Sequence, residues 1–108
     1  NDYFESYRKG GDAVRAYIFP GGMLPSENRF AEEAGRAGLR VTGTHRFGQD
    51  YATTLDRWLA AFDAKLDDVR ALGYDEKFIR LWRFYLASCA GTFRCGRTDV
   101  IQVDVQHV

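Results

Sequence analysis

The sequence is poor in proline and cysteine and has no excess of charge of either sign. Its 108 residues include two prolines and two cysteines, and 15 basic side chains balance 15 acidic ones. Zero net charge argues against a nucleic-acid-binding protein, because such a protein needs a basic surface to release counterions. No apolar run approaches the ~20 residues that a membrane-spanning helix requires.

The few cysteines and histidines do not form a metal-binding pattern. Cys89 and Cys95 are six residues apart, and His45 and His107 lie far from them in the sequence. This spacing does not match a known zinc motif, so we expect reduced thiols and a reducing compartment. If the strands that carry the two histidines pair antiparallel, His45 and His107 lie at opposite ends of the pair.

The composition that is present belongs to one globular domain or a piece of one. Hydrophobic residues make up 45% of the chain and aromatic residues 15%, so the core relies on large flat side chains. The first residue is Asn1 rather than Met. We therefore expect a fragment or a processed chain.

Residues 1–38 are expected to form a loop and short helices. Pro20 and Pro25 stand in the run FPGGMLP, where fixed and permissive backbone angles together indicate a tight loop. Ser26 is predicted to cap a short surface helix that ends at Gly38.

Residues 39–108 are predicted to form a strand, two helices and a second strand. Apolar and polar side chains alternate over 39–45 and again over 100–107, which is typical of half-buried strands. The fold class is therefore α/β.

The first long helix is indicated by one apolar stripe. Asp50 is its predicted N-cap and Gly73 its end, so we expect it to be unbroken. The members of the stripe recur at helical spacing: Tyr51, Leu55, Trp58, Leu59, Phe62, Leu66 and Val69.

The second long helix is indicated by a similar stripe, and Asp75 is its predicted N-cap. Leu81 and Phe84 add a second apolar side, so we expect this helix to be mostly buried beside the first one. Its stripe consists of Phe78, Trp82, Tyr85, Leu86, Cys89 and Phe93.

The charges of the two helical segments differ in sign. Residues 55–76 hold six acidic side chains against three basic ones, and residues 77–97 hold five basic side chains and no acidic one. Two interpretations stay open: attraction between neighbouring helices, or an anionic partner such as a phospholipid headgroup beside the second helix.

Four sequence blocks, in order and in register, resemble one family. The chain is similar to the C-terminal part of the cyclopropane-fatty-acyl-phospholipid synthase family, which includes the mycolic acid cyclopropane synthases. The blocks are YIFPGGMLPS (Tyr17 to Ser26), FGQDYATTLDRW (Phe47 to Trp58), LGYDEKFIRLWRFYLASCAGTFR (Leu72 to Arg94) and DVIQVDV (Asp99 to Val105).

The resemblance implies the C-terminal part of a class I S-adenosylmethionine-dependent methyltransferase fold, with a terminal antiparallel strand pair and two long helices. Such enzymes add a methylene carbon across a cis double bond of a lipid acyl chain. The alkene attacks the sulfonium methyl group, and a bound bicarbonate takes the proton as the cyclopropane ring closes.

The resemblance also assigns residues to the site. The tyrosine of the family's FGxDY motif, here Tyr51, hydrogen-bonds the bicarbonate, and the cysteine of the YLxxCAG motif, here Cys89, lies close to the reacting groups. Without the resemblance, both side chains are explained by core packing. The residues expected to contact the acyl chain are Met23, Leu24, Phe47 and Gly48.

The family's glycine-rich cofactor loop has no counterpart in this sequence. We therefore expect the S-adenosylmethionine site to lie mostly upstream, and the 108 residues alone to be inactive and to self-associate through apolar surface. The expected partners are phospholipid acyl chains at a membrane surface, met by a cytoplasmic enzyme peripheral to the inner membrane.

Two alternatives stay open. A related methyltransferase could make a methyl-branched product from a fatty acid or another small molecule. A non-enzymatic module could instead use the aromatic stripe as an acyl-binding groove. Bicarbonate dependence and product mass distinguish the first alternative from cyclopropane formation. Fatty-acid binding without cofactor would indicate the second alternative.

Overall fold

The computed structural model describes Ile18 and residues 23–108. The short helical pieces predicted before Phe19 and the first part of the FPGGMLP loop lie outside the described residues. The chain divides into two compact units, one formed by Asn1–His45 with Gln102–Val108 and the other by Arg46–Ile101. Each unit is described by itself.

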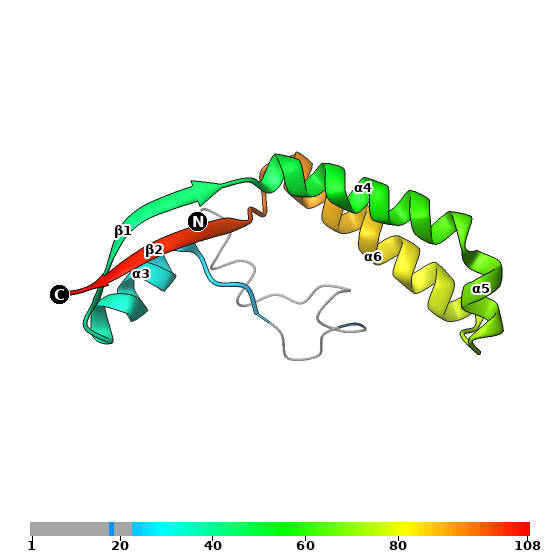
Figure 1. Ribbon diagram of the computed structural model, residues 1–108, viewed down its shortest axis with the longest axis horizontal. Helices are drawn as coiled ribbons and strands as arrows, with labels where there is room; N and C mark the ends of the chain where they lie inside the picture. Colours follow the sequence, from blue (N-terminus) through cyan, green and yellow to red (C-terminus); the bar gives the residue numbers. More distant parts are fainter. Residues whose placement is uncertain (1–17, 19–22) are drawn as a thin grey trace. The chain divides into compact units, whose positions relative to one another are not determined.

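The first unit begins with helix α3, Glu27–Arg36 (Figure 1). The Ser26 hydroxyl oxygen accepts a hydrogen bond from the Arg29 backbone N–H at 3.1 Å, which confirms the predicted N-cap. Gly38 follows the helix with a φ of +80°, a conformation that favours glycine after a helix end. Ala34 alone is buried within α3, so this is a surface helix as expected.

Two strands complete this unit, β1 (Leu39–Arg46) and β2 (Ile101–His107), which form a two-stranded sheet. Val108 N–H donates to Gly38 O at 3.1 Å, and Thr42 Oγ1 donates to Asp104 O at 3.3 Å. The start of β1 therefore lies beside the end of β2, which makes the pair antiparallel. His45 and His107 lie at opposite ends of the pair, as predicted.

The second unit holds helices α4 (Gly48–Ala64), α5 (Leu66–Ala71) and α6 (Glu76–Arg94). The prediction of one unbroken first helix is wrong, because Lys65 leaves helical geometry with φ −118° and ψ 21°. Asp67 and Asp68 then lie in the first turn of α5, where carboxylates stabilise a new helix N-terminus.

The predicted caps of this unit are confirmed at one helix and wrong at the other. Asp75 Oδ1 accepts from Phe78 N–H at 2.8 Å, which confirms the predicted start of α6. Gly73 closes the segment after α5 with a φ of +100°. Asp50, in contrast, is not the cap of α4, because the helix begins earlier, at Gly48.

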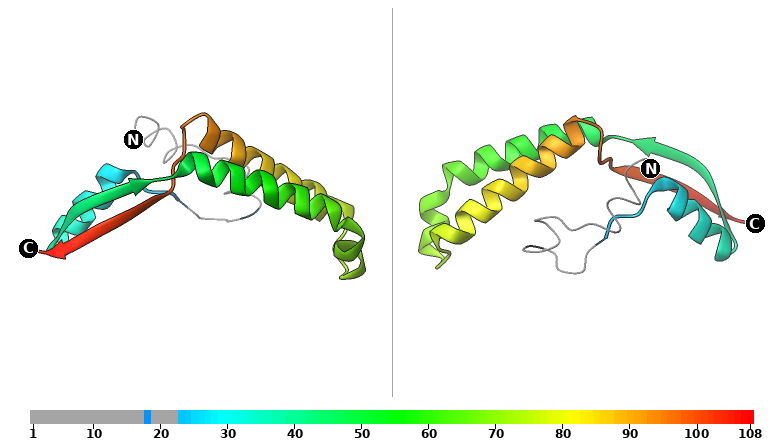
Figure 2. Two further views of the ribbon diagram at one scale, coloured as in Figure 1. Left: turned by 45° about the horizontal axis from the view of Figure 1, so that its top comes forward. Right: turned by 180° about the vertical axis from the view of Figure 1, so that it is seen from behind.

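The core of the second unit lies between α4 and α6, which run side by side in every view (Figures 1 and 2). Its buried members are Ala52 and Leu55 of α4 and Leu86, Ala90 and Phe93 of α6. The two alanines let the helix backbones approach each other, and the larger side chains fill the remaining space.

The expectation that α6 is mostly buried is wrong. Its buried residues are Ile79, Leu86, Ala90 and Phe93, whereas the Phe84 side chain is 53% exposed. Apolar side chains surround this helix, but α4 covers only one of its faces.

Ion pairs join α4 and α6 across their surface. Arg83 Nε lies 2.7 Å from Asp63 Oδ1, and the Arg94 guanidinium binds the Asp56 carboxylate. These contacts are the attraction between neighbouring helices that the first interpretation of the charge pattern predicts, and the second interpretation, an anionic partner beside α6, stays a prediction. Of the described helices, none is both long and apolar enough to cross a membrane.

Candidate functional site

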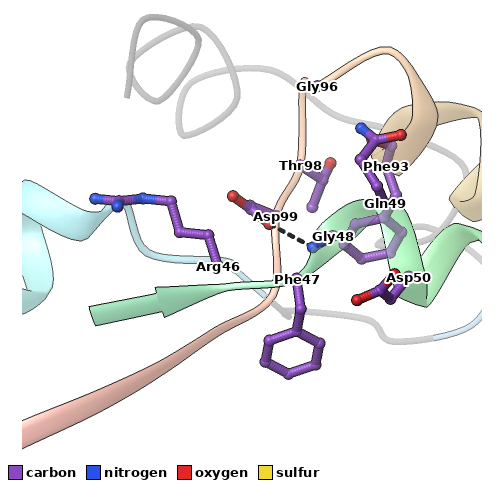
Figure 3. A pocket seen from close by; sticks show the side chains of 9 residues that line it. All are labelled: Arg46, Phe47, Gly48, Gln49, Asp50, Phe93, Gly96, Thr98 and Asp99. Carbon is purple, nitrogen blue, oxygen red and sulfur yellow. Dashed lines mark hydrogen bonds between the residues drawn. The ribbon is translucent and has the colours of Figure 1, made fainter. Parts of the chain in front are cut away.

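A shallow hollow of about 240 Å³ lies in the second unit where α4 begins (Figure 3). It is lined by residues 46–50 from the chain entering α4, by Phe93 at the end of α6, and by Gly96, Thr98 and Asp99 from the segment that follows. The FGQD segment (47–50) therefore lines the hollow together with Thr98 and Asp99, where the DVIQVDV block begins.

Asp99 caps α4 from a distance of 51 residues along the chain. Phe47 occupies the N-cap position but has no side-chain oxygen to accept a hydrogen bond. Asp99 Oδ1 replaces it by accepting from Gly48 N–H at 2.8 Å (Figure 3) and from its neighbour Val100 N–H at 2.9 Å. A carboxylate at this helix end also interacts favourably with the helix dipole.

Gly48 is required by this close approach. A Cβ atom at this position would lie 2.5 Å from Asp99 Oδ1 and 3.2 Å from Asp99 Cα. The first distance is far below van der Waals contact, and the second involves backbone that cannot easily move. The glycine of the FGxDY motif therefore has a structural reason in this chain.

Gln49 joins the start of α4 to the end of α6. Its Nε2 donates to Phe93 O at 2.9 Å and to Arg94 O at 3.4 Å. Both carbonyls belong to the last turn of α6, where backbone acceptors have no partner within the helix. Phe93 O also accepts from Gly96 N–H at 3.2 Å, so Gln49 adds a side-chain bond to the end of α6, whereas Asp99 caps the start of α4. We call this pair of contacts the capping joint.

Tyr51 lies one turn beyond the capping joint. Its N–H donates to Phe47 O at 3.1 Å, an early backbone bond of α4. Its half-buried ring meets Phe93 edge-on, with ring centroids 5.0 Å apart, and meets Trp58 edge-on at 6.0 Å. Edge-to-face pairs of this kind are favourable and restrict ring orientation.

Cys89 and Tyr85 lie on the face of α6 that also carries Phe93, at helical spacing of four. Tyr51, Tyr85 and Cys89 all pack against the core cluster of the second unit. Burial raises the pKa of the Tyr85 phenol above its usual value, and Cys89 and Tyr51 raise it further. The structure therefore brings both residues predicted to be catalytic to one region, with a second phenol beside them.

An aromatic wall extends from this region along α6. Trp82 lies 5.0 Å from Tyr85 and stacks on Phe78 at 5.8 Å, and Phe78 stacks on Tyr74 at 4.4 Å (all between ring centroids). Tyr85 thus stands at one end of a row of rings that runs along α6 to Tyr74, and the pair of Tyr51 and Phe93 belongs to the same core region as Tyr85. Such a row of rings can exclude water from a reacting group.

The remaining predicted contacts divide between the two units. Phe47 and Gly48 line the hollow, whereas Tyr51 and Cys89 are not among its lining residues. Met23 and Leu24 belong to the first unit, where their side chains are 53% and 56% exposed. The catalytic and acyl-binding roles assigned to these six residues stay predictions.

The described residues do not fit the role of the cofactor loop. Within Ile18 and 23–108, the strand-to-helix junction runs from β1 into α4 and carries one glycine, Gly48, whose N–H already binds Asp99. Gly38, Gly73 and Gly96 have positive φ angles, but each follows a helix rather than a strand. Among the same residues, no cluster of side chains suits a metal ion, and neither cysteine is in a disulfide.

Sequence reasoning missed three residues of this site. Asp99 and Gln49 gain their role from partners more than 40 residues away, which periodicity does not reveal. Tyr85 was assigned only to an apolar stripe. The one available signal was the position of these residues inside the blocks that carry the family resemblance.

Comparison with known proteins gives one consistent family. The family model "Mycolic acid cyclopropane synthetase" matches residues 3–103. Tuberculostearic acid methyltransferase UfaA1 of Mycobacterium tuberculosis is 40% identical over 90 residues, which are 82% of this chain and 21% of that protein. Cyclopropane-fatty-acyl-phospholipid synthase of Escherichia coli is 38% identical over 90 residues, which are 83% of this chain and 23% of that protein.

A solved structure agrees with these relatives. The crystal structure of mycolic acid cyclopropane synthase CmaA1, complexed with SAH and CTAB, matches with a TM-score of 0.82 and 35% sequence identity. The match covers 97% of this chain and 34% of that one. The chain thus spans about a fifth to a third of the length of the proteins it matches.

Proposed function

Since the chain belongs to the mycolic acid cyclopropane synthetase family, we propose that it forms the C-terminal part of an S-adenosylmethionine-dependent enzyme that adds a methylene carbon across a cis double bond of a lipid acyl chain. S-adenosylmethionine would supply that carbon, and most of the residues that bind it would lie outside this part. The observation that carries the proposal is that Tyr51 of α4 and Tyr85 and Cys89 of α6 pack against the same core cluster.

The role proposed for Tyr51 is to donate a hydrogen bond to a bound anion, which the family resemblance identifies as bicarbonate. A tyrosine hydroxyl can donate one hydrogen bond, and such a bond is stronger where water is excluded. The rings of Phe93 and Trp58, which hold the Tyr51 ring edge-on, support a fixed direction for that hydroxyl. Fixed donors stabilise charge without reorganising during the reaction.

The aromatic wall has a second proposed role. Ring closure on an alkene passes through positive charge on carbon, which the faces of aromatic rings stabilise. The stacked rings of Tyr74, Phe78 and Trp82 support an apolar lining along which an acyl chain could lie. Cys89 would contact the chain or the reacting groups beside Tyr85. We place the enzyme at the cytoplasmic face of a membrane, as a peripheral protein that reaches phospholipid acyl chains.

The test is Tyr51→Phe in the full-length enzyme that carries this sequence. Removing the hydroxyl while keeping the ring should lower kcat by about 100-fold, the lower end of the range for loss of one positioned donor, with little change in the melting temperature. Methyl transfer from labelled S-adenosylmethionine to vesicles of phospholipid with cis-unsaturated chains measures the rate. Tyr74→Phe, which removes a hydroxyl from the same wall, is the matched control. Wild-type turnover in Tyr51→Phe would contradict the proposal.

A second candidate product is favoured by one comparison. UfaA1 is named a tuberculostearic acid methyltransferase, and it is 40% identical to this chain over 90 residues. The enzyme would accordingly transfer the methyl group to the alkene and lose a proton to give a methylidene-branched chain instead of a cyclopropane ring, and a separate hydride donor would reduce that product to the methyl branch. Bicarbonate dependence of the rate and mass spectrometry of the product distinguish the two outcomes.

A further inference from the structure

The capping joint holds the start of α4 and the end of α6 at one place in the second unit. Asp99 Oδ1 accepts from Gly48 N–H at 2.8 Å, and Gln49 Nε2 donates to Phe93 O at 2.9 Å. Phe47 N–H adds a backbone bond to Val100 O at 2.9 Å. These three contacts are made by three consecutive residues at the start of α4 and join it to the end of α6 and to the segment 99–100.

The first turn of α4 depends on these contacts from outside. The N-cap residue Phe47 makes no side-chain capping bond, so Asp99 is the side chain that satisfies the N–H of Gly48. A helix end without a cap frays in its first turn. Tyr51 closes that first turn through its N–H bond to Phe47 O, so fraying would release the backbone that carries the phenol.

The Gln49 contact of the capping joint fixes the position of Phe93, the aromatic partner of Tyr51. Gln49 is bonded to the carbonyl of Phe93, and the Phe93 ring is the edge-on partner of the Tyr51 ring at 5.0 Å. Cys89 lies one turn before Phe93 on α6. A shift between the start of α4 and the end of α6 would therefore change the direction of the Tyr51 hydroxyl relative to Cys89.

We propose that Asp99 and Gln49 are positioning residues for Tyr51. Neither needs to touch the substrate, because both act through the first turn of α4 and its contact with Phe93. This inference rests on the function proposed above for Tyr51. The FGQD segment and the distant Asp99 would then affect the rate of catalysis as well as the stability of the fold.

The primary test compares two helix caps in the full-length enzyme. Asp99→Ala and Asp75→Ala each remove a carboxylate that accepts a backbone N–H at 2.8 Å at the start of a long helix. We expect similar falls in melting temperature, but a fall of about tenfold in kcat only for Asp99→Ala, with KM for cis-unsaturated phospholipid vesicles unchanged. Asp99→Asn keeps the accepting oxygen and should restore kcat.

An equal loss of kcat in Asp75→Ala and Asp99→Ala would overturn the proposal, because both variants would then act through stability alone. Failure of Asp99→Asn to restore kcat would overturn it as well. If Asp99→Ala yields no folded protein, Gln49→Ala loosens the same joint at an exposed side chain. Wild-type kcat in Gln49→Ala would then reject the inference.

A double variant separates this inference from the proposed function. If Asp99 acts through Tyr51, Asp99→Ala should lower kcat in the wild-type background and have no further effect in a Tyr51→Phe background. A full additive loss would show that Asp99 acts elsewhere. If Tyr51→Phe alone keeps wild-type activity, the function proposed for Tyr51 fails. If it loses activity while Asp99→Ala does not, only the positioning role fails.

Discussion

At the residue scale, the start of α4 is decided by a side chain that is remote in sequence. Asp50 has the right chemistry for a cap, and local reasoning selects it because it precedes the apolar stripe. The helix nevertheless begins at Gly48, because Asp99 supplies the accepting oxygen there and the missing Cβ leaves room for it. A glycine within a helix costs backbone entropy, and here the contact with Asp99 offsets that cost.

Gly48→Ala tests this explanation. The added methyl group would overlap the Asp99 carboxylate and approach its Cα, so we expect a loss of about 2 kcal/mol in the free energy of unfolding. Gly91→Ala is the matched control, because a Cβ at that helical glycine of α6 meets nothing within 4 Å. It should stabilise the protein by about 0.5 kcal/mol. Chemical denaturation measures both, and equal effects would contradict the steric explanation.

At the element scale, α6 has apolar side chains around most of its circumference but contacts α4 along one face only. Leu86 is 4% exposed and packs into the core cluster, whereas Phe84, two residues earlier, points away from it and is 53% exposed. Arg83 and Arg94 extend from α6 to the carboxylates of α4. The stripe of the second helix therefore identifies the packed face correctly, but it does not show which other faces are covered.

The two apolar positions should respond differently to truncation. Leu86→Ala leaves a cavity between α4 and α6 and should lower the free energy of unfolding of the chain by about 3 kcal/mol. Phe84→Ala should change it by less than about 0.5 kcal/mol, because its side chain has little packing to lose. Thermal unfolding followed by circular dichroism compares them. A larger loss in Phe84→Ala would mean that the assigned core face is wrong.

At the scale of the whole molecule, the expected fold is confirmed by the solved cyclopropane synthases that the chain matches. The chain covers 34% of such a protein, and large apolar side chains are exposed on it, including Trp58, Leu72, Tyr74 and Phe84. Surface aromatics in a small unit are candidates for contact with other protein surface. This is consistent with our proposal that the chain works as part of a larger enzyme.

The isolated 108-residue chain should accordingly self-associate. Phe84→Asp places a charge in the exposed apolar surface of α6 and should shift the sedimentation profile towards the monomer. Thr53→Asp adds the same charge at an exposed polar position of α4 and should leave association unchanged. A monomeric wild-type chain at micromolar concentration would contradict this prediction.

Local sequence patterns are sufficient to predict those features of the chain that depend on neighbouring residues. Ser26, Gly38, Gly73 and Asp75 mark helix ends through contacts within a few residues, and the alternating strands and helical stripes follow from backbone periodicity. The strands and the second long helix are found in the structure, whereas the first helical stripe is divided between α4 and α5.

The remaining features could be read only from the folded chain, because they depend on groups that folding brings together from distant positions. The cap of α4, the tie from Gln49 to α6 and the meeting of Tyr51 with Phe93 each join residues more than 40 positions apart. Periodicity reports which face of a helix is apolar, but it carries no information on which oxygen lies opposite a given N–H. That information arises only when the helices and the segment after α6 pack together.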